Sequence, residues 1–353
     1  MSQHRRVFTP LSYRPVDLCV ARKIEDVVFT FVQMLATQSH RRPLLKLHSV
    51  ADGSRSRWTR HTCGRIGRLL RLLSDVHKLL INDQYTTKRD LYYQNVLVYG
   101  GSQHRLDSSL SAAGRLLQEH RYCLHILATN KGLVFGPLTY TDGDGTQIDC
   151  RSSPASISSH VVNARRIHGF NTAEFVLVVE KDAIMQKLVN DGWAMHWPNG
   201  ILITGKGYPD ISTRVLLKKT VHELRIPVFV LVDADPHGLE IFVMYKYGPK
   251  KPTYDSDHLA SPTCRLIGVL RTEMDELPIP PDQHVQMRNS EYRKLVKLKS
   301  RRDVERDRDV SKQLFALETS GTKLEIEAVS SVSPTFLIDS YLREKIQLQK
   351  SVL

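Results

Sequence analysis

Carboxylates directly follow two apolar, β-branched runs of this chain. Glu180 comes after Val178-Val179, and Asp233 and Asp235 come at the end of the run Leu231-Val232. Short apolar runs bounded by polar residues are typical of buried strands in a parallel sheet, and the carboxyl ends of such strands open onto a ligand crevice. Hard oxygen ligands gathered at that edge suit Mg²⁺, a cation that also bridges phosphate oxygens. The pattern therefore predicts a magnesium site that acts on a phosphate group.

The segments around these carboxylates alternate between strand and helix. A helix is expected from Ala183 to Asn190, an apolar strand at Ile201–Thr204, a Gly-Lys-Gly turn at Gly205–Gly207 and a second helix from Ser212 to Leu224. Such alternation predicts a doubly wound α/β domain. Acidic residues at a single strand end are often only solvated loop residues, so the prediction depends on the two acidic patterns together.

Three longer strings in this region resemble a known family. Glu180 with Asp233-x-Asp235 resembles the Toprim acidic triad of topoisomerases and primases. The strings Val178–Ala183, Thr204–Asp210 and Val232–Glu240 resemble, more narrowly, the A subunit of topoisomerase VI, and Asp-Ala-Asp-Pro-His-Gly favours its eukaryotic counterpart, the meiotic double-strand-break protein. The resemblance runs with gaps from Cys63 to Ile346. It implies an α/β plus α+β chain, in which a CAP-like winged-helix domain precedes a Rossmann-like Toprim domain.

A tyrosine lies where that family carries its nucleophile. The string Thr86–Gln94 resembles the family's nucleophile motif, whose second aromatic position is Tyr93 in this chain. Thr87 can cap a helix that begins at Lys88, so that Arg89 and Tyr93, four residues apart, share one face. A guanidinium there would stabilise phenolate character or bind the scissile phosphate. Tyr92 points about 100° away around the helix and is expected to be a packed or surface residue.

The segments around Tyr93 predict the helices of a winged-helix module. Helices are expected at Ile66–Ile81, Lys88–Asn95 and Leu106–His120, and Cys123–Ala128 with Leu133–Phe135 is expected to form a hairpin, the wing. The third helix of such a module enters the DNA major groove. Few of its side chains suit base recognition, so contacts mainly to phosphate are expected.

Four parts are expected along the chain. Residues 1–60 are a variable N-terminal extension with one amphipathic helix at Val20–Ala36, and residues 61–150 are the winged-helix domain that carries the tyrosine. Residues 151–168 are a Ser/Pro-rich linker, and residues 169–353 are the Toprim domain with its C-terminal helices.

The composition favours a polyanionic partner inside the cell. The 353 residues contain 50 Lys plus Arg against 37 Asp plus Glu, a formal charge of +13, although mitochondrial and ribosomal proteins have a similar balance.

No apolar run approaches about 18 residues, so no membrane span is predicted. The segment Met1–Pro10 lacks an apolar signal core. The 5 cysteines form no Cys-x-x-Cys pair and no even disulfide set. We therefore expect reduced thiols in a nuclear or cytosolic protein, and the family resemblance implies the nucleus, on chromosomes.

The resemblance implies a metal-assisted transesterification. Tyr93 would attack a backbone phosphate and stay linked to the 5′ end of the DNA. Glu180 and Asp233, assisted by Asp235, would hold Mg²⁺, or Mn²⁺ in its place; which carboxylates touch the metal directly is left open. Further contacts to DNA or its phosphates are predicted for Lys206, Arg214 and His237.

The same resemblance implies several partners. Double-stranded DNA is the substrate, and a homodimer would pair the tyrosine of one subunit with the metal site of the other. The chain lacks the phosphate-loop pattern Gly-x-x-x-x-Gly-Lys-Ser/Thr, so ATP coupling would need a separate B-type, ATPase-like subunit, besides other break-forming accessory proteins. Two alternatives stay open. A Toprim-type nuclease would use the same carboxylates without leaving protein on DNA, and a non-catalytic DNA-binding scaffold would need neither Tyr93 nor metal.

Overall fold

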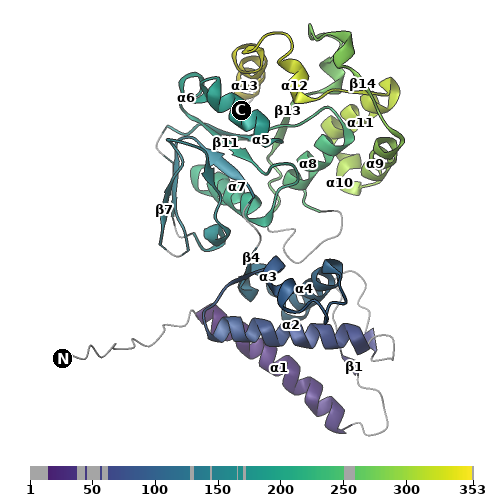
Figure 1. Cartoon of the computed structure of the whole chain (residues 1–353). Coiled ribbons are helices and arrows are strands. Elements are labelled where there is room, and N and C mark those ends of the chain that lie inside the picture. The colour runs from purple at the N-terminus through teal and green to yellow at the C-terminus, as the bar shows by residue number, and fades with distance from the viewer. Residues whose placement is uncertain are drawn as a thin grey trace, which may run out of the picture. The chain divides into compact units, whose positions relative to one another are not determined.

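The computed structural model of the chain describes residues 15–37, 44–45, 56–57, 63–127, 131–143, 145–164, 166–169, 172–249 and 259–351 (Figure 1). The chain divides into two compact units, Met1–Leu127 and Ala128–Leu353. No helix of the described residues has the length and apolar character needed to cross a membrane.

The first unit is built mainly from helices. Its elements are α1 Pro15–Thr37, β1 Leu44–Leu45, β2 Ser56–Arg57, α2 Cys63–Ile81, β3 Thr86–Thr87, α3 Lys88–Gln94, α4 Gln103–Leu117, η1 Arg121–Leu124 and β4 Ile126–Leu127. Leu69, Leu73, Val76 and Leu80 recur every three or four residues along α2, and they form one buried face that packs into the core of the unit. The four predicted helices are confirmed, with ends that differ by a few residues.

The predicted wing hairpin is wrong. β4 pairs in parallel with β3, Thr86 opposite Ile126, and it does not pair with the strand that follows it. That strand, β5 Leu133–Phe135, belongs to the second unit, where Leu202 of β11 lies opposite Phe135. The three residues of β5 are apolar and lie between β11 and β8 in the large sheet, whereas a two-stranded ribbon would leave most of their surface in water.

A six-stranded sheet forms the centre of the second unit. Its order is β13-β12-β10-β11-β5-β8, formed by Arg265–Gly268, Val228–Leu231, Phe175–Val179, Gly200–Thr204, Leu133–Phe135 and Ala155–Ser156. The first four strands are parallel, with Val176 of β10 between Val228 and Ile201. Beyond them, β5 pairs antiparallel with both β11 and β8. All five residues of β10 are buried, as expected for a parallel strand that is covered on both faces.

Helices cover both faces of this sheet. Val176 and Val178 share a core with α7 Ile211–Leu224 and α8 Pro236–Lys246. Leu177 and Val179 point the opposite way, into a core that contains α5 Asp182–Asn190, α6 Trp193–His196, the π-helix η5 Leu337–Tyr341 and α13 Leu342–Ser351. The prediction of a doubly wound α/β domain is therefore confirmed.

The stretch predicted as a linker is packed. It contains β8, η2 Ser159–Asn163 and part of β9 Arg166–Gly169, and its Ile157 and Val161 are fully buried. β9 pairs with β6 Leu138–Thr141, which also pairs with β7 Gln147–Asp149. The predicted domain limits at residues 60, 150 and 168 stay predictions; the division into compact units falls at Leu127 because β5 joins the large sheet.

The remaining elements follow the large sheet in sequence. They are η3 Arg271–Glu273, η4 Pro281–Gln283, β14 Val285–Gln286, α9 Asn289–Lys299, α10 Arg302–Arg306, α11 Arg308–Ser320, β15 Thr322–Lys323 and α12 Ile326–Val329. β14 and β15 pair antiparallel, with Val285 opposite Lys323. A single bridge then joins Leu324 to Ala234, directly beyond β12. This bridge brings the segment 323–327 to the carboxyl ends of the parallel strands.

Candidate active site

Tyr93 is exposed on a short helix whose start is fixed by its sequence. The hydroxyl of Thr87 accepts a hydrogen bond from the main-chain N–H of Asp90 at 3.1 Å, and α3 begins at Lys88 as predicted. The side chain of Tyr93 is 57% exposed, whereas Tyr92 is buried in the core of the first unit. The guanidinium carbon of Arg89 lies 5.8 Å from the centre of the Tyr93 ring. The two residues therefore share one solvent-facing side of α3, and Tyr92 is the packed neighbour.

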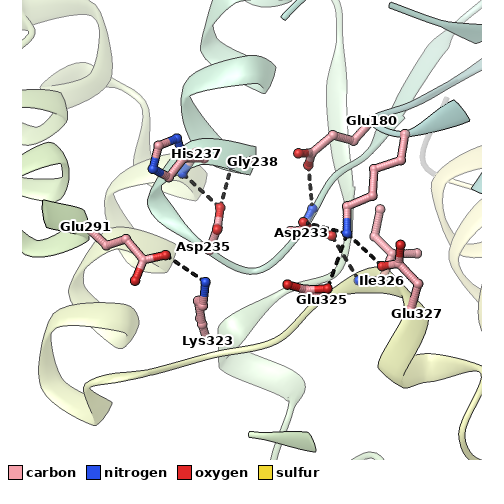
Figure 2. A network of polar contacts seen from close by, with 11 residues as sticks. Glu180, Asp233, Asp235, His237, Gly238, Glu291, Lys323, Glu325, Ile326 and Glu327 are labelled. Carbon is pink, nitrogen blue, oxygen red and sulfur yellow. Dashed lines mark hydrogen bonds and ion pairs between the residues drawn. The ribbon is translucent and has the colours of Figure 1, made fainter. Parts of the chain in front are cut away.

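Glu180 and Asp233 lie side by side at the ends of neighbouring parallel strands. Glu180 follows β10 and Asp233 comes two residues after β12. The main-chain N–H of Asp233 donates to Oε2 of Glu180 at 2.9 Å (Figure 2). The N–H of Glu180 donates to the carbonyl of Leu231 at 3.1 Å. The structure thus brings together two of the three predicted metal ligands, which are far apart in the sequence.

Burial of these carboxylates disfavours their charged forms. Glu180 and Asp233 are 8% and 6% exposed. Burial, together with the charge of Asp233, raises the pKa of Glu180 to about 8. Burial also raises the pKa of Asp233 to about 6, although the Ile326 N–H and the Lys181 ammonium both favour its charged form. A divalent cation between them would relieve the repulsion that this arrangement creates.

Asp235 is the N-cap of helix α8. Its Oδ1 accepts hydrogen bonds from the main-chain N–H groups of His237 at 2.8 Å and Gly238 at 2.7 Å. The side chain is 8% exposed, and its charge contributes to raising the pKa of Glu180. Oδ1 of Asp235 therefore caps the helix, and Oδ2 is available as a ligand at the same edge of the sheet.

The donor set fits a hard divalent cation. Each of the three carboxylates accepts at least one main-chain N–H, which orients the group. Carboxylate oxygens held in this way suit Mg²⁺ or Mn²⁺, which take oxygen ligands. The second oxygen of Asp233 does not face open space, because Lys181 Nζ lies 3.1 Å from its Oδ2.

Lys181 connects the site to two glutamates that the sequence analysis did not single out. Its ammonium lies 2.7 Å from Oε2 of Glu327 and 3.5 Å from Oε2 of Glu325 (Figure 2). Although burial opposes the charge, the ion pairs with Glu327 and Asp233 raise the pKa of Lys181. The N–H of Ile326 also donates to Oδ1 of Asp233 at 2.9 Å. The alternating pattern Lys-Leu-Glu-Ile-Glu at 323–327 was a signal for a half-buried edge segment.

The Gly-Lys-Gly turn contacts the same edge of the sheet. The N–H of Gly207 donates to the carbonyl of Glu180 at 2.7 Å. Lys206 has a positive φ of 52°, and its ammonium lies 2.9 Å from Oδ2 of Asp182. His237 is in the first turn of α8, and Arg214 is 6% exposed within α7. Their predicted contacts to DNA stay predictions.

A separate group in the first unit was not found from the sequence. Among the described residues, Asp17, Asp83 and His125 offer ligand atoms within 4.8 Å of one another. His125 Nε2 lies 3.2 Å from Oδ1 of Asp17, and His125 Nδ1 lies 3.0 Å from the carbonyl of Gln84. Because Asp17 and His125 are distant in sequence, no local pattern could have paired them.

Each of the two units contains a region that matches a known protein family. Residues 175–346 match the family of Toprim domains from topoisomerase 6 A subunits and Spo11, and residues 64–126 match the family described as "Type IIB DNA topoisomerase". The meiotic recombination protein SPO11 of Mus musculus is 36% identical over 279 residues, which cover 79% of this chain and 70% of that protein. SPO11 of Homo sapiens is 36% identical over 281 residues, with the same shares. The A subunit of DNA topoisomerase 6 from Arabidopsis thaliana is 32% identical over 280 residues, 79% of this chain and 65% of that protein.

Proposed function

This chain belongs to the family of topoisomerase VI A subunits and Spo11 proteins, and on that basis we propose that it cleaves DNA by transesterification and makes the double-strand breaks that initiate meiotic recombination. The observation that carries the proposal is the exposed Tyr93, beside Arg89, in the region that matches type IIB topoisomerases. A buried carboxylate pair in the region that matches the Toprim domain supports it.

The proposed reaction exchanges one phosphodiester for another. The hydroxyl oxygen of Tyr93 attacks a backbone phosphorus, the bond to the deoxyribose 3′-oxygen breaks, and that oxygen leaves as a 3′-hydroxyl after it takes up a proton. The tyrosine loses its proton and becomes linked to the 5′ phosphate. Because a phosphodiester is both consumed and formed, the step needs no external energy source.

Arg89 supports this step from the same face of α3. A phenol ordinarily ionises near pH 10, so a cation close to the ring favours phenolate character. The guanidinium can also bind the scissile phosphate in a bidentate manner. In the first role Arg89 would activate the nucleophile, and in the second it would hold the phosphate beside Tyr93.

Glu180 and Asp233, with Asp235, would hold Mg²⁺, and Mn²⁺ would substitute for it. The bound cation would supply positive charge for the phosphate and the leaving oxygen. The residues of this chain orient the site: the Asp233 N–H holds Glu180, the Ile326 N–H holds Asp233, and the α8 N-terminus holds Asp235. Lys206, Arg214 and His237 would contact the DNA or its phosphates.

The assembly that we propose follows from family membership. α2, α3 and α4 would be the helices of a winged-helix domain that binds double-stranded DNA in the nucleus, on chromosomes. A homodimer would combine Tyr93 of one subunit with the carboxylates of the other. Further break-forming proteins and a B-type, ATPase-like subunit would complete the complex, as the match to topoisomerase 6 A subunits suggests.

The test is a search for a covalent protein–DNA adduct. The full chain is incubated with supercoiled DNA and Mg²⁺ or Mn²⁺, with a B-type subunit present in a parallel reaction, and is then denatured. We expect protein on the 5′ ends, which is lost in Tyr93→Phe and retained in the matched variant Tyr92→Phe. Cleavage without an adduct would identify a Toprim-type nuclease, and tight binding without cleavage in either reaction would favour the scaffold.

A further inference from the structure

The ammonium of Lys181 already contacts an oxygen of Asp233 that is available to a metal. Oδ1 of Asp233 accepts the Ile326 N–H, and Oδ2 is 3.1 Å from the Lys181 ammonium. A cation that binds Asp233 through Oδ2 therefore competes with the ammonium for this oxygen. We propose that Lys181 is a built-in counter-ion that neutralises Asp233 in the metal-free protein and moves onto Glu325 and Glu327 when a divalent cation binds. This inference rests on the metal site of the proposed function.

The two carboxylates that would receive the ammonium, those of Glu325 and Glu327, already contact it. Lys181 Nζ is 2.7 Å from Glu327 Oε2 and 3.5 Å from Glu325 Oε2, so both receiving carboxylates are already within ion-pair distance. The side chains of Glu325 and Glu327 are 54% and 45% exposed, against 8% for Asp233. The movement therefore takes the ammonium toward better solvation.

The main chain holds the two glutamates in place during this exchange. The N–H of Ala234 donates to the carbonyl of Leu324 at 2.9 Å, and the N–H of Ile326 donates to Asp233. Glu325 and Glu327 thus flank a residue that is bonded to the metal-site carboxylate itself. The main-chain position of Glu325 and Glu327 relative to Asp233 is therefore fixed by contacts that do not involve Lys181.

Other ammonium groups near this edge are paired elsewhere. Lys206 lies 2.9 Å from Asp182, and Lys323 lies 2.7 Å from Glu291. Among the ion pairs of the described residues, those of Lys181 are the ones that reach a carboxylate of the predicted triad. Lys181 is therefore the side chain that competes with the metal for Asp233.

The first test measures Mn²⁺ binding to the full chain, without DNA, by titration calorimetry. In Lys181→Met the competing charge is gone, and we expect the dissociation constant to fall about tenfold, since an opposite charge within about 4–6 Å shifts the proton affinity of a carboxylate by about 1–3 pKa units and acts on a bound metal cation in the same direction. The matched control is Lys187→Met, whose ammonium pairs with Asp191 at 2.9 Å and which has the same 28% side-chain exposure. Its affinity should equal that of the unaltered chain. Unchanged or weaker binding in Lys181→Met would overturn the proposal.

A double-variant cycle tests the exchange itself. Glu327→Gln removes the closer of the two receiving carboxylates, so Mn²⁺ binding should weaken several-fold in the unaltered chain and hardly at all in the Lys181→Met background. An equal loss in both backgrounds would show a through-space effect of the glutamate and would reject the exchange. If Lys181→Met does not fold, Lys181→Gln is used in the same cycle. Absence of Mn²⁺ binding to the unaltered chain would instead reject the metal assignment in the proposed function.

Discussion

Glu180 accepts a hydrogen bond through Oε2 from the main-chain nitrogen of Asp233, at 2.9 Å. The two residues follow the carboxyl ends of neighbouring parallel strands, β10 and β12, and the N–H of Glu180 donates to the carbonyl of Leu231 on the other strand. Their separation is therefore set by the spacing between strands in the sheet, about 4.8 Å. A metal site formed by these residues would be held by the rigid parallel sheet.

Removal of one metal-site carboxylate should abolish cleavage without loss of DNA binding. Glu180→Gln keeps the acceptor for the Asp233 N–H but removes the group that ionises to a carboxylate ligand when a cation binds. We expect the initial rate of adduct formation to fall at least about 100-fold, while gel-shift affinity for DNA stays the same. Glu305→Gln, an exposed glutamate of α10, is the matched control and should cleave normally. A Glu180→Gln protein that cleaves at an unchanged rate would refute a role for this carboxylate.

Mixed dimers should regain one active site. In heterodimers of a Tyr93→Phe chain and a Glu180→Gln chain, one composite site carries both defects and the other carries neither. Nicking of supercoiled DNA is therefore expected, although neither homodimer cleaves. Differently tagged chains, purified through both tags, make the measurement clean. Complete inactivity of a verified heterodimer would argue that each subunit uses its own tyrosine and carboxylates.

Gly238 should be intolerant of a side chain. A Cβ at this position would lie 2.3 Å from the carbonyl oxygen of Asp233 and 2.9 Å from its nitrogen, so the metal-site turn would have to shift. We expect Gly238→Ala to lower the free energy of unfolding in urea by about 1–3 kcal/mol and to weaken Mn²⁺ binding. Gly67→Ala is the control, because a Cβ there meets nothing within 4 Å on helix α2 and should stabilise by about 0.5–1 kcal/mol. Equal changes in the free energy of unfolding in the two variants would contradict this prediction.

Asp307 should stabilise the second unit in a pH-dependent manner. Its Oδ2 accepts from Lys246 Nζ at 2.7 Å and from the Tyr247 hydroxyl at 2.9 Å, and its Oδ1 caps α11. Although burial opposes this, the hydrogen bonds from Lys246 and Val310 lower the pKa of Asp307 below its ordinary 3.8. Because the folded-state pKa is depressed, the stabilisation is complete above about pH 4 and is lost as the pH falls through the folded-state value.

The measurement compares urea unfolding of Asp307→Asn with that of the unaltered chain at several pH values. Asparagine keeps the capping oxygen but not the charge, so a loss of about 1–3 kcal/mol is expected at pH 7. The difference should shrink steadily below about pH 4. Asp275→Asn, whose side chain is 78% exposed, should change stability by less than about 0.5 kcal/mol at every pH. A constant difference for Asp307→Asn across the range would rule out its charge as the cause.

Local sequence was sufficient for most helices and parallel strands. The predicted helix at Ala183–Asn190 is observed as Asp182–Asn190, and the helix predicted from Ser212 begins at Ile211. Helix α4 ends earlier than predicted because Gln118 adopts a left-handed conformation with φ 54°. The predicted wing hairpin was wrong for another reason. The apolar residues of β5 do not specify whether their partner strand lies close by or far along the chain.

The amino-acid sequence alone determined which groups are available for chemistry: a tyrosine one turn after an arginine on a capped helix, and carboxylates at the ends of buried strands. Periodicity and capping act within a few residues, so these features can be read locally. Only the tertiary structure decided that the Asp233 N–H donates to Glu180 and that one oxygen of Asp235 caps a helix. It also decided that Lys181 forms ion pairs with Glu325 and Glu327. Those contacts depend on strand order and on the bridge between Ala234 and Leu324, which join segments that no local pattern connects.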